Sequence, residues 1–170
     1  MKKIKSTEII ENRKKYDKEI KKMWNIVSVQ FYMFIYFKNA TRNYDMKALL
    51  DTITEMSNNR IQTKLDSIAI NLGFKNRKDF PKESIYPIIY TLSEKNEYLV
   101  QLGSIPTINP GLKAKLGKKK LFKTEEITAD YITKLKNKLQ LEINALKKKL
   151  EDFNSNAEID ISTAYMYLAA

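Results

Sequence analysis

The sequence predicts a mainly α-helical protein with a long helix towards each end of the chain and a turn-rich centre. All four glycines and all four prolines lie between residues 73 and 117, whereas the first 72 and the last 53 residues contain neither. Because glycine and proline are the commonest breakers of regular structure, both flanks are expected to be helical. Apolar residues recur at helical spacing along both flanks, which supports the same prediction.

The first flank predicts one long helix over residues 7–39. Its apolar residues follow 4-3-4-4-3 spacing, which places them on one side of a helix; they are Tyr16, Ile20, Met23, Val27, Phe31 and Phe34. A strand over residues 27–37 is the alternative, since apolar residues also alternate there and many are β-branched or aromatic. The unbroken helical spacing from Tyr16 onward favours the helix.

The centre predicts three shorter helices followed by strands. The first two span residues 45–57 and 60–72, and Gly73 stands where a glycine often ends a helix. A third, over residues 84–95, has Ser84 as its cap and Pro87 in its first turn, where a missing N–H costs little. Residues 97–102 then read as a short strand, and residues 105–108 as a paired return strand.

The second flank predicts a coiled-coil-like helix that begins after Thr124, a good N-cap residue. Its apolar seam runs over about three heptads and consists of Ile132, Leu135, Leu139, Ile143, Leu146, Leu150 and Phe153. A short terminal helix is expected over residues 161–168. The predicted organisation is therefore a long helix over 1–40, a central domain with a basic loop over 41–123, and pairing and terminal helices over 124–170.

The order of the central elements resembles that of winged helix-turn-helix DNA-binding proteins. The likeness is carried by residues 65–74, a helix with Ala69 on its packed face that ends in Leu-Gly-Phe, and by the capped helix and strand that follow. It covers residues 46–108 and implies that residues 85–92 form the recognition helix. The turn over residues 74–83 departs from the pattern, being longer than the usual 3–4 residues. An all-helical bundle without the strand is the alternative.

The charge of the chain favours a polyanionic partner such as duplex DNA. Lys and Arg number 31 against 20 Asp and Glu, for a net charge of +11. The surplus is local: residues 1–24 hold nine basic and four acidic side chains, residues 75–82 four and one, and residues 111–123 six and none. Residues 124–153, by contrast, hold six of each sign, which suits a helix that serves pairing.

Two groups of residues are the predicted DNA contacts. Basic side chains beside the recognition helix and after the wing are expected to bind phosphates; they are Lys75, Arg77, Lys78, Lys82, Lys113, Lys115, Lys118, Lys119 and Lys120. The outer face of the recognition helix would read bases through Ser84, Tyr86, Tyr90 and Thr91. Because that helix lacks the usual Arg, Asn or Gln, specificity would depend on DNA shape or on Asn76 and Arg77.

Long flanking helices of this kind pair two copies in small winged-helix regulators, so a homodimer is expected. The residues predicted at its interface are apolar members of the two flanks: Val27, Phe31, Phe34, Leu135, Leu139, Ile143, Leu146 and Leu150.

The composition argues against an enzyme. Without Cys or His, the chain lacks thiolate metal sites, a His general base and Cys or Ser–His nucleophile pairs, and no cofactor or metal is expected. No apolar stretch reaches the length of a membrane span, and no signal peptide is recognisable, which favours the cytoplasm.

The first functional hypothesis is a DNA-binding protein, either a transcriptional regulator or a replication or partition factor of a mobile element. The second is a helical protein–protein interaction module without a nucleic-acid role, which predicts no strand near residues 97–108. A third, a membrane-surface protein, predicts an exposed aromatic face over residues 23–37.

Overall fold

The computed structural model describes residues 4–36, 45–75, 77–81, 84–105 and 129–158, and in these ranges it is almost entirely helical. Its elements are α1 (Ser6–Tyr36), α2 (Met46–Asn71), the 3-10 turn η1 (Arg77–Asp79), α3 (Tyr86–Ser104) and α6 (Ala129–Asn156). No strand occurs in the described ranges. The predicted mainly α-helical class is therefore confirmed.

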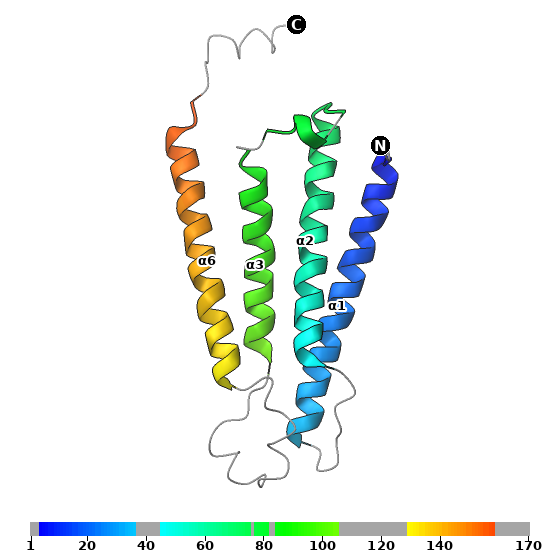
Figure 1. Ribbon diagram of the computed structural model, residues 1–170, viewed down its shortest axis with the longest axis vertical. Coiled ribbons are helices and arrows are strands. Elements are labelled where there is room, and N and C mark those ends of the chain that lie inside the picture. The colour runs from blue at the N-terminus through cyan, green and yellow to red at the C-terminus, as the bar shows by residue number, and fades with distance from the viewer. Residues whose placement is uncertain (1–3, 37–44, 76, 82–83, 106–128, 159–170) are drawn as a thin grey trace, which may run out of the picture.

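The four long helices lie side by side in chain order and run alternately up and down (Figure 1). Helix α1 packs against α2, α2 against α3, and α3 against α6. Side chains from all four helices, together with Ile105 just after α3, meet in one apolar core. Its buried members are Ile20, Trp24, Val27, Met46, Leu50, Ile53, Leu102, Ile105, Ile132 and Leu139.

Helix α1 confirms the helical interpretation of the first flank, and the alternative strand over residues 27–37 is wrong. The helix continues through Tyr36, and Ile20, Trp24 and Val27 are buried along its inner side. The helical spacing favours the helix over the strand because residues 3–4 apart share one face of a helix, which can then be buried together. The side chains of Phe31 and Phe34 lie outside the described residues.

Helix α2 corrects the prediction of two helices over residues 45–57 and 60–72, because both belong to one continuous helix. Asn58 and Asn59 do not break it, since asparagine in a helix costs only about 0.7 kcal/mol or less relative to alanine. Burial of Ile53 and Ile61 on either side of them offsets that cost. At the N-terminus, the Asp45 carboxylate caps the helix by accepting from the Ala48 N–H at 3.0 Å.

The end of α2 follows the prediction. Gly73 has a φ of 80°, the left-handed conformation that glycine adopts without a steric penalty. The Gly73 N–H donates to the Ile70 carbonyl and the Phe74 N–H to the Ala69 carbonyl, at 3.0 and 2.9 Å. These bonds satisfy carbonyls that the helix end leaves open.

Helix α3 begins close to the predicted start but overturns the strand over residues 97–102, which are helical through Ser104. Pro87 lies in the first turn, as predicted. The strand would have placed Tyr98, Val100 and Leu102 on one face. Instead Val100 is 70% exposed while Leu102 is fully buried, because residues 98, 102 and 105 share one helical face towards the core. Of the predicted return strand, residues 106–108 lie outside the described residues.

The apolar seam of helix α6 packs against other helices of the same chain. Ile132, Leu139 and Ile143 are buried, and α6 packs against α3. Of the predicted dimer residues, Val27, Leu139 and Ile143 are therefore buried within the chain. Leu135, Leu146 and Leu150 are only partly buried. Thr124 and the expected helix over residues 161–168 lie outside the described residues.

Candidate interaction groove

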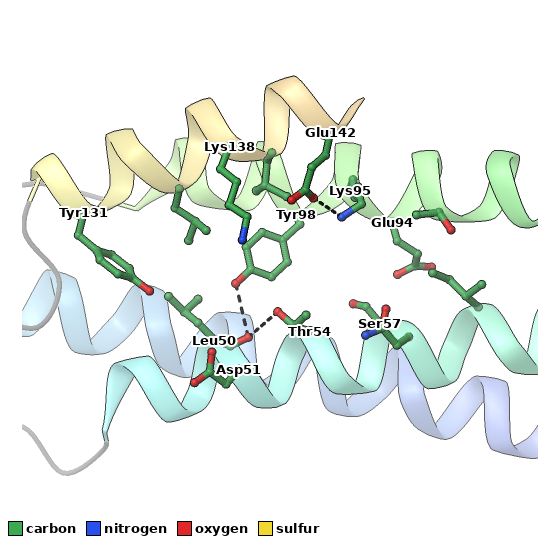
Figure 2. Close-up of a pocket in the computed structure, with 15 residues that line it drawn as sticks. Leu50, Asp51, Thr54, Ser57, Glu94, Lys95, Tyr98, Tyr131, Lys138 and Glu142 are labelled. Atoms are coloured by element: carbon green, nitrogen blue, oxygen red, sulfur yellow. Dashed lines mark hydrogen bonds and ion pairs between the residues drawn. The ribbon is translucent and has the colours of Figure 1, made fainter. Parts of the chain in front are cut away.

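A groove of about 430 Å³ lies between α2 and α6, with α3 as its floor (Figure 2). It arises because α3 packs against both α2 and α6, whereas α2 and α6 leave a space between them. The lining combines apolar, aromatic, hydroxyl and charged side chains; its members are Leu50, Asp51, Thr54, Ser57, Asn58, Ile61, Thr91, Glu94, Lys95, Tyr98, Tyr131, Leu135, Lys138, Leu139 and Glu142.

The helical repeat brings these residues to the groove from three separate stretches of chain. The lining residues of α2 recur every three or four positions from Leu50 to Ile61, and those of α6 do so from Tyr131 to Glu142. Each set therefore forms one stripe along its helix. At a rise of 1.5 Å per residue, both stripes are about 16 Å long, so the groove is elongated along the helices.

Tyr98 forms the centre of the floor. Its hydroxyl donates to the Leu50 carbonyl at 3.4 Å, and the Thr54 hydroxyl donates to the same carbonyl at 2.9 Å (Figure 2). Behind it, the Trp24 ring packs edge-on at a centroid distance of 5.0 Å. Burial raises the pKa of Tyr98 to about 12, although the neighbouring Thr54 hydroxyl acts in the opposite direction. The floor is thus held in place from α1 and α2.

Two lysines of the groove differ in their pairing. The Lys95 ammonium on α3 is paired with the Glu142 carboxylate on α6, which ties these helices together. The Lys138 side chain extends from α6 into the groove towards Tyr98 (Figure 2), and it forms no ion pair or hydrogen bond with another described residue. Asp51 stands at the α2 side of the groove (Figure 2).

A buried ionic cluster adjoins the groove through Glu94. Arg60 is 7% exposed and donates from Nε to Glu94 at 3.0 Å and from Nη1 to Asp17 at 2.9 Å. It also bonds Glu97 at 2.6 Å, and Lys64 donates to the second Glu94 oxygen at 2.8 Å. Burial alone would lower the pKa of Arg60, but the bonds to Glu94 and Asp17 outweigh it and raise that pKa. The guanidinium therefore joins α1, α2 and α3.

The predicted base-reading residues are partly buried and lie in and just before the first turns of α3. The rings of Phe74, Phe80, Tyr86 and Tyr90 follow one another at centroid distances of 5.9, 6.3 and 6.4 Å. The Lys64 ammonium lies 5.5 Å from the centre of the Tyr90 ring. The Ser84 hydroxyl accepts from the Tyr86 N–H at 3.2 Å, and Thr91 lines the groove.

The predicted phosphate contacts are described only in part. Lys75 and Lys78 are exposed beyond the end of α2, at the end of the bundle where α1 begins (Figure 1). Arg77 belongs to η1, but its side chain is outside the described residues. So are Asn76, Lys82, Lys113, Lys115, Lys118, Lys119 and Lys120. The start of α1, which belongs to one basic segment, and η1, which belongs to another, thus lie at the same end of the bundle (Figure 1).

The groove itself was missed by the sequence-based predictions. The charge balance of residues 124–153 suggested a helix that serves pairing, which gave no reason to single out Lys138. A signal was present in the spacing of Tyr131, Lys138 and Glu142, which places one aromatic and two charged residues beside the apolar seam of α6.

The chain matches no protein-family model, no curated protein and no solved structure. In the described ranges, no three acidic side chains gather as metal ligands. None of the described helices combines the length and apolarity that crossing a bilayer requires.

Proposed function

We propose that the protein is a helical protein–protein interaction module whose docking surface is the groove between α2, α3 and α6. The observation that carries this proposal is the helical state of residues 97–102. The interaction hypothesis expects no strand there, whereas the wing of a winged helix needs one. As a helix, the same stretch supplies Tyr98 to the floor of the groove.

The make-up of the groove suits a protein partner. Tyrosine is enriched at the energetically dominant positions of protein interfaces, because it buries a large apolar ring and keeps a polar tip. Tyr98 and Tyr131 occupy the groove together with Leu50, Leu135 and Leu139. Asp51, Asn58 and Lys138 supply polar groups at its sides, and such groups fix the orientation of a bound partner.

Sedimentation equilibrium of the whole chain, with and without a duplex oligonucleotide, tests the proposal. At about 50 mM salt, where phosphate contacts are strong, we expect the sedimenting mass of the protein to be unchanged by the duplex. A protein–DNA complex under these conditions would contradict the proposal.

A second candidate function is binding of duplex DNA by a regulator or a replication or partition factor, with two copies paired. The net charge of +11 and the exposed Lys75 and Lys78 at the end where α1 begins support it. Reversal of both charges, Lys75→Glu with Lys78→Glu, would then weaken duplex binding and reduce its salt dependence. Lys134→Glu with Lys136→Glu makes the same change in net charge on α6 and is the matched control.

A further inference from the structure

We infer that the groove takes an amphipathic helix of a partner protein, with the apolar face of that helix on Tyr98 and an acidic edge towards Lys138. This inference rests on the proposed function and specifies the chemistry of the partner. Three features of the groove carry it, namely its length, its apolar floor and a lysine, Lys138, that pairs with no other residue in the described ranges.

The length of the groove suits a bound helix better than a compact ligand. The stripes Leu50 to Ile61 and Tyr131 to Glu142 run along neighbouring helices for about 16 Å, which is three turns of an added helix. Of the lining side chains, Leu50, Ile61 and Leu139 are buried, whereas Tyr98, Tyr131 and Leu135 are partly exposed. A helix with apolar residues every three or four positions can contact these three partly exposed side chains, as helices do in hydrophobic grooves.

The charged side chains that line the groove indicate that one edge of the bound helix is acidic. Glu142 is already neutralised by Lys95, and Glu94 by Arg60 and Lys64. Lys138 alone among the cations lining the groove has no partner in the described part of the chain, and its ammonium extends over the floor (Figure 2). A carboxylate of the bound helix would complete this pair in partly desolvated surroundings, where ion pairs are stronger than in water.

The α2 side of the groove and the net charge of the chain further restrict the kind of protein that can bind. Asp51 on α2 faces the other side of the bound helix, so that side is polar or basic. A second copy of this chain is a poor occupant, because each copy carries a net charge of +11 and two such copies repel each other. We therefore assign the groove to a different protein.

The test is a fluorescence anisotropy titration of the full chain with two labelled peptides of about 14 residues, long enough for the three turns of the groove. Both carry leucines on one face; one has glutamates along one edge, and the other has glutamines at the same positions. The chains compared are wild type, Lys138→Gln and Lys147→Gln. Lys147 is exposed on α6 and lies nine residues, or about two and a half turns, from Lys138, which puts it on the opposite side of the helix. Both variants lose one positive charge.

Lys138 is exposed in the free chain, and a bound helix would cover its ion pair only in part. We therefore expect the glutamate peptide to bind wild type, and Lys138→Gln to weaken binding about five- to tenfold. Lys147→Gln should change binding less than about twofold, since its charge is distant and screened. Neither variant should alter binding of the glutamine peptide. Equal losses of affinity in Lys138→Gln and Lys147→Gln would mean that only general charge attraction holds the peptide, which would overturn the inference. The absence of binding to wild type at a protein concentration of about 100 µM would also overturn it.

The failure of this inference differs from failure of the proposed function. If the peptides do not bind and the sedimenting mass is unchanged by the duplex, only the acidic helical occupant is wrong. If wild type self-associates and Lys138→Gln disperses it, the occupant is a second copy, which also contradicts the inference. If the duplex forms a complex, the proposed interaction role fails whatever the peptides do.

Discussion

The Arg60 guanidinium on α2 and the Glu94 carboxylate on α3 form a buried ion pair, with exposed fractions of 7% and 5%. Burying two charges costs several kcal/mol unless each is fully paired. Here Glu94 also accepts from Lys64, and Arg60 also donates to Asp17 and Glu97. Since these partners come from α1, α2 and α3, the pair holds three helices in one register beside the groove.

Arg60→Met is expected to lower the free energy of unfolding by about 3 kcal/mol, because it leaves the buried Glu94 with Lys64 alone. Chemical denaturation followed by circular dichroism measures the loss. The double variant Arg60→Met with Glu94→Gln should recover part of it, because it removes the unpaired charge. A loss below about 1 kcal/mol in the single variant would mean that the cluster is solvated and does not hold the helices.

Tyr98 is expected to make the stability fall at alkaline pH. Its pKa is about 12 in the folded chain and 10.0 for the ordinary side chain, so the folded state keeps the proton more tightly. The resulting stabilisation is present below pH 10.0 and is lost as the pH rises from there through about 12. Denaturation of wild type and Tyr98→Phe at a series of pH values checks this. The decline should be shallower in the variant; identical slopes in both chains would contradict the burial of Tyr98.

Two glycines should respond oppositely to alanine. Gly73→Ala is expected to destabilise by about 1 kcal/mol, because a φ of 80° strains any residue with a Cβ. Gly103→Ala is expected to stabilise by about 0.5–1 kcal/mol, since Gly103 lies inside α3 and nothing stands within 4 Å of an added Cβ. Thermal unfolding measures both. A destabilised Gly103→Ala would indicate that the chain turns there, as a wing requires.

Neighbouring apolar residues of α3 should differ in their importance. Leu102→Ala is expected to cost about 2–5 kcal/mol because the side chain is fully buried in the core. Val100→Ala should change stability by less than about 0.5 kcal/mol, because Val100 is 70% exposed. Urea denaturation of the two variants gives the comparison. Similar losses at both positions would fit the strand alternation and contradict the helix.

Local signals in the sequence predicted much of the fold. The spacing of Ile20 and Val27 predicted α1, the position of Gly73 predicted the end of α2, and Pro87 fell in the first turn of α3. Each of these depends on residues within a few turns of one another, and such relationships are readable along the chain.

The errors came from weak local preferences that tertiary packing overrides. Two helices were predicted over residues 45–57 and 60–72, but packing on both sides of Asn58 and Asn59 continues one helix through them. The β-favouring residues Tyr98 and Val100 suggested a strand, but their contribution is small beside the burial of Leu102 in the core. Packing against the other helices determines the conformation of these residues, and a local sequence pattern carries no information about such packing.

The candidate groove could not be predicted because its residues come from three distant stretches. Arg60 and Glu94 are 34 positions apart, and Lys95 and Glu142 are 47 apart. Nothing in the sequence indicates which of the many lysines and glutamates will pair. That Lys138 has no ionic partner among the described residues therefore becomes visible only once the helices are placed.

Amide chemical-shift mapping of the whole chain tests the central claim most directly, with the glutamate peptide added in one titration and duplex DNA in another. The account predicts that the peptide shifts amides along Leu50 to Ile61 and Tyr131 to Glu142, the two sides of the groove, and that the duplex leaves them unchanged. Shifts caused by the duplex around Lys75 and Lys78, with none in the groove on adding the peptide, would contradict it.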